Sequence, residues 1–198
     1  MRNLLVTTFV TLDGVMQAPG GPEEDESGGF AHGGWSFGYW DKVLDDVMTE
    51  TMGRPFDLLL GHRTYDIFAS YWPTAEQEAA KPLNDATKYV AAHHDVNLPW
   101  GPSVHVRDVP SEVAALKRGD GPELQVHGSA NLIQTLLREG LVDEFQVLTY
   151  PLLLGSGKRL FGDGTVPAGL ELVSSQVSPS GVVIARYRPA GAIKYGSF

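Results

Sequence analysis

The chain has 198 residues, and its 24 Asp and Glu against 15 Lys and Arg give a formal charge of −9 at pH 7. Its 42% hydrophobic and 20% charged residues are typical of a globular protein and exclude wholesale disorder. The length favours a single domain over residues 1–198. An acidic chain without runs of Lys or Arg lacks the positive charge that nucleic acid or an anionic membrane requires, so we expect a small-molecule partner.

Cysteine is absent, which excludes disulfides, thiolate catalysis and Cys-ligated metals. The six histidines show no H-x-x-H or H-E-x-x-H spacing, so we predict no metal site. The apolar N-terminal stretch is short, contains several threonines and runs into Asp13, unlike a signal peptide or a membrane span. We therefore expect a cytoplasmic protein.

The predicted elements begin with a strand at residues 3–12, which is apolar without a helical period. An acidic, glycine-rich loop follows over residues 17–34, and its composition indicates either a functional lid or a mobile surface segment. Further along the chain, hydrophobic periodicity and turn residues predict strands at 56–60, 88–92, 124–127, 143–150, 170–177 and 182–188, and helices at 41–52, from the Gly61 turn to before Pro73, at 110–118 and at 130–139.

Strands that alternate with helices over the first two-thirds of the chain predict an α/β fold with a central mixed, mostly parallel sheet flanked by helices. The last two strands are separated only by the turn at 178–181, which predicts a C-terminal antiparallel hairpin.

Two segments, 60–64 and 127–131, bring a strand through a glycine into a helix. A helix N-terminus offers unpaired N–H groups and the positive end of the helix dipole, and glycine lets a phosphate approach the backbone. Together these turns could hold one dinucleotide. Neither is a G-x-G-x-x-G motif, so Ser129 could instead be only an N-cap, and Thr64 only a residue of the first helical turn.

Four other residues are candidates for chemistry. His93 and His94 follow a predicted strand end and could meet a phosphate beside Arg63, or could be ordinary solvated loop histidines. Asp13 follows the first strand, where an active-site carboxylate or an ordinary Asp-Gly turn would lie. Asp45 borders the apolar stripe of the helix 41–52, as a partly buried acid or as part of its solvated flank.

In order, five motifs give the chain a resemblance to a known family: residues 11–15, 60–66, 126–132, 140–144, and 151–157 with 160–161. They resemble the dihydrofolate reductase fold, and more closely the RibD C-terminal family, the reductase domain of riboflavin biosynthesis. The resemblance spans nearly the whole chain and implies a dihydrofolate reductase-like fold. It also implies that NADPH lies across the strand ends of the central sheet.

The resemblance also implies the roles of individual residues at a cofactor site. The first turn would hold phosphate, although His62 stands where the family commonly has arginine. The second turn would meet the pyrophosphate, a loop pair would surround the 2′-phosphate and favour NADPH over NADH, and segment 151–155 would line the nicotinamide. In the same order, the residues are Gly61, Arg63 and Thr64 for the first turn; Gly128, Ser129, Ala130 and Asn131 for the second turn; His93 and His94 for the loop pair; and Leu153 and Gly155 for the segment at the nicotinamide.

By the same resemblance, the protein is expected to be an NADPH-dependent reductase that transfers hydride to a pyrimidine or pterin-like heterocycle, similar to 5-amino-6-(5-phosphoribosylamino)uracil reductase. Asp13 would orient the substrate or assist protonation, and Asp45 would lie near the carboxylate that binds pterin in dihydrofolate reductases. The alternatives are a true dihydrofolate reductase and a non-catalytic NADP(H)-binding module. Members are often dimers, so a homodimer is expected.

Overall fold

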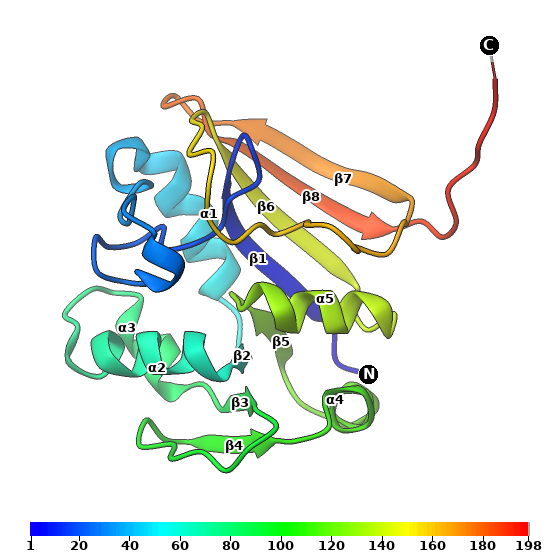
Figure 1. Ribbon diagram of the computed structural model, residues 1–198. Helices are drawn as coiled ribbons and strands as arrows, with labels where there is room; N and C mark the ends of the chain where they lie inside the picture. Colours follow the sequence, from blue (N-terminus) through cyan, green and yellow to red (C-terminus); the bar gives the residue numbers. More distant parts are fainter. Residues whose placement is uncertain (198) are drawn as a thin grey trace.

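The computed structural model describes residues 1–197 and contains an eight-stranded sheet with the strand order β4-β3-β2-β5-β1-β6-β8-β7 (Figure 1). The first six strands in this order run parallel, and β8 pairs antiparallel with β6 and β7. Their bounds are β1 (Leu4–Thr11), β2 (Phe56–Gly61), β3 (Lys88–Ala91), β4 (Ser103–Val106), β5 (Glu123–Val126), β6 (Glu144–Tyr150), β7 (Leu170–Val177) and β8 (Val183–Pro189). The predicted α/β fold with a C-terminal antiparallel hairpin is confirmed.

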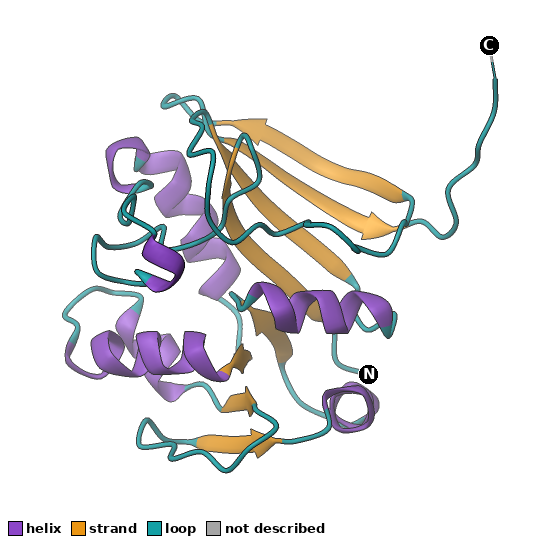
Figure 2. Cartoon of the chain, viewed as in Figure 1, coloured by secondary structure: helices purple, strands orange, loops and turns teal. Residues whose placement is uncertain are grey.

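Helices lie on both faces of this sheet (Figure 2). They are α1 (Lys42–Met52), α2 (His62–Tyr71), α3 (Ala80–Asp85), α4 (Val109–Arg118) and α5 (Ala130–Arg138), with 3₁₀ turns η1 (Ser27–Gly29), η2 (Phe37–Tyr39) and η3 (Trp72–Thr74). None of the helices within residues 1–197 combines the length and the apolar character needed to cross a bilayer.

The alternation of side chains along the central strands divides the core between the two faces. On β1, Val6 and Val10 pack with α4 and α5, whereas Phe9 faces the cluster formed with α1. On β2, Leu58 and Leu60 pack against α2 and α3. Because both faces of these strands are covered, apolar side chains occur on both faces, which explains why the sequence shows no two-residue alternation there.

Two elements, α3 and β4, were not predicted from the sequence. The helix α3 has only six residues and contains Pro82, so it is too short to show a hydrophobic period. The strand β4 is a four-residue edge strand in which only Val106 is buried. The helix α3 lies between α2 and β3, the strand β4 lies between β3 and α4, and neither changes the order of the elements around the glycine turns.

Candidate active site

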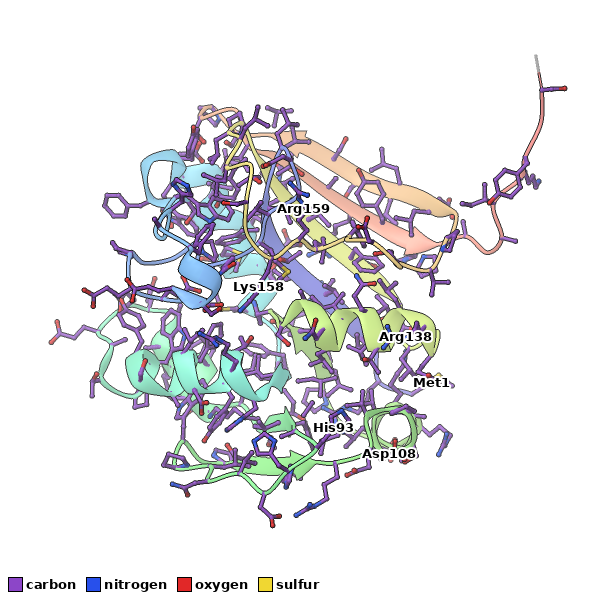
Figure 3. All side chains as sticks on the ribbon, viewed as in Figure 1. Met1, His93, Asp108, Arg138, Lys158 and Arg159 are labelled. Carbon is purple, nitrogen blue, oxygen red and sulfur yellow. The ribbon has the colours of Figure 1, made fainter. Side chains whose placement is uncertain are left out.

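The carboxyl ends of the six parallel strands lie along one edge of the sheet, where ligands of open α/β sheets commonly bind. The predicted site segments follow these strands: residues 12–15 after β1, 62–64 after β2, 92–94 after β3, 127–129 after β5 and 151–155 after β6. Figure 3 labels His93, after β3, and Lys158, after β6, which lie toward opposite sides of the parallel part of the sheet.

The two glycine turns touch each other at this edge because β2 and β5 are neighbours. The Gly61 N–H donates to the carbonyl of Gly128 at 3.3 Å. A Cβ on Gly61 would lie 2.5 Å from Ser129 Oγ, and a Cβ on Gly128 would lie 3.0 Å from Thr64 Oγ1. The structure therefore packs Gly61, Thr64, Gly128 and Ser129 into one compact cluster, as two turns acting on one ligand would require.

Each turn starts a helix whose N-terminus has no side-chain cap. Gly61 is the N-cap of α2 and has no side chain, and Ser129 is the N-cap of α5 but its hydroxyl makes no capping hydrogen bond. Serine at this position normally accepts from the first helical turn. Within residues 1–197, the first-turn N–H groups of both helices therefore lack a side-chain acceptor, and the two positive helix ends face the same region. Ala130 and the exposed Asn131 form the first turn of α5.

His127 immediately precedes the second turn and was not singled out by sequence reasoning. Burial lowers the pKa of its imidazole to about 4, so the ring is neutral at pH 7. Its ring lies 6.1 Å from that of Phe68 on α2, and within the described chain its buried Nε2 has no hydrogen-bond partner. An unpaired buried nitrogen is costly, so this atom marks a place where an additional polar group would be stabilising.

Arg63 contacts the acidic loop. Its Nη2 lies 2.7 Å from Oδ1 of Asp25, and Lys158 Nζ lies 2.6 Å from the other oxygen of that carboxylate. Burial alone would raise the pKa of Asp25, but hydrogen bonds from Lys158 and Ser27 hold it below its ordinary value. Arg63 thus lies at the carboxyl edge of the sheet, as predicted, and its guanidinium is paired with the carboxylate of Asp25 from the same chain. Sequence reasoning missed Asp25 and Lys158 because 133 residues separate them.

The two loop histidines are exposed at the end of β3. The ring of His94 lies 5.3 Å from that of His62, at the start of α2, in an edge-to-face arrangement. His62 Nε2 is in turn 3.5 Å from a carboxylate oxygen of Asp66. The structure therefore joins His94, the second residue of the predicted pair, to the first glycine turn through His62, the residue that departs from the family pattern. His93 is exposed beside it.

Asp13 ties the end of β1 to the segment that follows β6. Its carboxylate accepts hydrogen bonds from Thr11 Oγ1 at 2.5 Å, from Gly155 N at 2.7 Å and from Leu154 N at 3.3 Å. The hydrogen bond from Thr11 is the main reason that the pKa of Asp13 lies below its ordinary value. Asp13 is therefore an anion at neutral pH with several of its acceptor positions already used. Leu153, in the same segment, is 69% exposed.

The sequence left two alternatives for Asp45, a partly buried acid or a residue of the solvated flank of its helix. The structure places it exposed on α1, which contradicts the first alternative. Its carboxylate accepts from the indole Nε1 of Trp40 at 2.5 Å. The Trp40 ring lies 5.9 Å from that of Phe9, which is itself 5.6 Å from Tyr150. Asp45 thus lies beside an aromatic cluster on the α1 face of the sheet. No group of three metal-ligating side chains occurs in the part of the chain that the structure describes.

This architecture is a dihydrofolate reductase-like α/β fold. Dihydrofolate reductase from Enterococcus faecalis, complexed with NADP(H), superposes with a TM-score of 0.59 at 15% identity, covering 95% of this chain and 96% of that one. A pyrimidine reductase-like protein from Corynebacterium diphtheriae gives 0.63 at 15% identity, with coverages of 95% and 92%. A candidate riboflavin biosynthesis protein from Shewanella sp. PV-4 gives 0.72 at 22% identity, with coverages of 94% and 98%.

The family follows from the sequence match. Residues 2–184 match the model of the RibD C-terminal domain, and the chain belongs to this family. It is 28% identical over 190 residues to the uncharacterized protein YyaP of Bacillus subtilis (strain 168), a match that covers 92% of each chain. Membership of this family and the dihydrofolate reductase-like fold support a reductase-type function.

Proposed function

We propose that the protein is an NADPH-dependent reductase that transfers a hydride to an electrophilic carbon or imine of a planar pyrimidine or pterin-like heterocycle. The observation that carries the proposal is the direct contact between the two glycine turns. This contact gathers two uncapped helix N-termini at the carboxyl edge of the sheet. Such a pair suits the phosphates of a dinucleotide, because both supply N–H donors and positive dipole ends to one anion.

The residues present fit NADPH. The first turns of α2 and α5 would hold the pyrophosphate, with Gly61, Thr64 and Ser129 lining the contact between them. The exposed histidines after β3, together with His62, would lie near the 2′-phosphate, and segment 151–155 with Leu153 and Gly155 would flank the nicotinamide. When bound, NADPH supplies a hydride, and the protein supplies position and electrostatics.

We assign an orienting role to Asp13. A carboxylate whose pKa is lowered cannot donate a proton at neutral pH, which argues against direct protonation of the substrate by this group. Its hydrogen bonds to the N–H groups of Leu154 and Gly155 hold the segment after β6 against the end of β1. Asp13 would thus fix the wall against which substrate and nicotinamide meet, while its charge favours developing positive charge nearby.

A planar substrate would find aromatic surface on the α1 face. Trp40 is 43% exposed, lies against Phe9 of β1 and donates its indole N–H to Asp45. Aromatic rings stack favourably on planar heterocycles, and a neighbouring carboxylate can accept hydrogen bonds from ring N–H or amino groups. Asp45 is therefore a candidate for substrate binding through its exposed oxygens.

The decisive test is a fluorescence titration of the purified protein with NADPH and, in parallel, NADH. We expect NADPH to bind and NADH to bind less tightly. Ser129→Asp places a negative charge at the start of α5 and should weaken NADPH binding at least tenfold, while Thr49→Asp, an exposed position on α1, should leave it unchanged. Unchanged affinity in folded Ser129→Asp would remove the second turn from the site, and binding without turnover of heterocyclic substrates would favour the non-catalytic module.

We also propose that the protein forms a homodimer through β7. This edge strand is exposed at all eight positions, and two of its apolar side chains, Leu172 and Val177, are 53% and 66% exposed. An exposed apolar edge strand invites pairing with another strand, and a second copy would bury it symmetrically. The segment after β8 extends away from the rest of the molecule beside this strand (Figure 1). Sedimentation should show a dimer at micromolar concentration, and a monomer would contradict the proposal.

A further inference from the structure

The acidic loop (residues 17–34) carries four consecutive carboxylates at positions 23–26, but only Asp25 is buried. Glu23 and Glu26 are exposed, and Glu24 accepts locally from the N–H groups of Gly20 and Gly21. The Asp25 side chain, 9% exposed, is directed toward the body of the protein instead. A buried carboxylate is stable only when it is paired and hydrogen-bonded, so its partners indicate its role.

Those partners are two cations from opposite sides of the candidate site. Arg63, in the first turn of α2, contacts Asp25 Oδ1 at 2.7 Å, and Lys158, on the segment after β6, contacts Oδ2 at 2.6 Å. Two cations around one carboxylate leave a net positive charge. The Arg63 side chain is 57% exposed and the Lys158 side chain 43%, so an anion that approaches α2 can reach the Arg63 guanidinium and compete with Asp25 for it.

The acidic loop has a second anchor that does not involve Arg63. Gln17 is buried and donates through Nε2 to the carbonyls of Asp25 and Ser27, each at 2.9 Å. Its Oε1 accepts from the N–H of Lys158 at 3.0 Å. These bonds fix the loop to the segment after β6, so the contact between Asp25 and Arg63 can break while Asp25 stays on Lys158.

We propose that Asp25 is an internal competitor for Arg63: a phosphate of the incoming dinucleotide must displace the Asp25 carboxylate from the guanidinium, and Lys158 retains the displaced carboxylate. This inference rests on the proposed function, because it takes the first turn of α2 as a phosphate site. Asp25 then lowers the affinity for the cofactor and links the position of the acidic loop to cofactor occupancy. Cofactor binding can change the equilibrium between the two positions of the loop only by the difference in free energy between the Arg63–Asp25 contact and the Arg63–phosphate contact.

The test compares the dissociation constants for NADPH of the wild type, Asp25→Asn and Glu26→Gln by fluorescence titration. Glu26→Gln is the matched control, because it removes one negative charge from the same loop at an exposed position. Asp25→Asn should bind NADPH about two- to fivefold more tightly, as expected for release of a partly exposed ion pair, and the control should match the wild type. In an Arg63→Met background, Asp25→Asn should bring no gain.

Equal or weaker binding by folded Asp25→Asn, or an equal gain in Glu26→Gln, would overturn the competition while leaving the proposed function intact. Absence of NADPH binding to every form, the wild type included, would overturn the proposed function itself.

Discussion

Replacement of Gly61 by alanine tests the contact between the two glycine turns. The backbone at Gly61 has φ −67° and ψ 148°, which alanine adopts without strain, so the only penalty is steric. The new Cβ would lie 2.5 Å from Ser129 Oγ, 3.2 Å from its Cβ and 3.4 Å from its N. To relieve the first contact the hydroxyl must leave its native rotamer, and the other two contacts remain, so the turns must move apart.

Overpacking of this kind costs about 1–3 kcal/mol, while the lower entropy of the unfolded alanine chain returns about 0.4–1 kcal/mol. We therefore expect a net loss of about 1–2 kcal/mol, which for a protein of this length lowers Tm by about 2–8 °C. Gly38→Ala is the matched control, because a Cβ on Gly38 meets nothing within 4 Å, and it should be neutral or slightly stabilising.

The assay is urea unfolding of Gly61→Ala, Ser129→Ala and the double variant, with NADPH titration of each. Because Ser129→Ala removes the atom nearest to the new methyl group, the double variant should be more stable than the sum of the two single effects predicts. Wild-type stability of Gly61→Ala, or strict additivity in the double variant, would refute the close contact of the turns. It would also remove the main support for a shared phosphate site.

Two further predictions concern pH. Lys88 is fully buried beneath the Trp100 ring with its Nζ donating to the carbonyl of Asn84, and burial lowers its pKa to about 8. The unfolded chain therefore binds more protons between pH 8 and 10.5, and wild-type stability should rise with pH across that window by up to about 3 kcal/mol relative to Lys88→Met. If the difference in unfolding free energy between the wild type and Lys88→Met does not change with pH, the Trp100 ring and the Asn84 carbonyl offset the desolvation of the Lys88 ammonium. For Asp13, whose folded pKa is lowered chiefly by Thr11, the stability advantage of the wild type over Asp13→Asn should be complete at pH 6 and disappear as the pH falls through the folded pKa. An advantage at pH 6 that persists unchanged at pH 2 would contradict the ionic role.

The glycine turns were predictable because their signals are local. A short apolar strand, a glycine and a helix follow one another within a few residues at Gly61 and again at Gly128. Their contact was not predictable, because it depends on β2 and β5 being neighbours, although β3, β4 and α4 separate them along the chain. Strand order is set by packing of the whole sheet, and no single segment carries that information.

The ion pairs of the acidic loop could not be predicted from the sequence, for a different reason. The segment from Gln17 to Gly34 has no hydrophobic period, so nothing in it distinguishes the buried Asp25 from the exposed Glu23 and Glu26. Its partner Lys158 lies beyond five strands of intervening chain. Such contacts become visible only when tertiary structure brings distant segments together, which is why loop residues that determine ligand affinity are harder to predict than buried strands.

A chain with a formal charge of −9 can still favour an anionic dinucleotide, because the charge that matters is local. Charges farther than a Debye length of about 8 Å are largely screened at physiological ionic strength, whereas donors at the contact are not. Along this edge the carboxylates of Asp13 and Asp25 are each engaged by hydrogen bonds or cations, and the helix N-termini of α2 and α5 are uncapped. Neutralising the surface acids should therefore change the affinity for NADPH much less than one new charge at Ser129, since only the latter acts at contact distance.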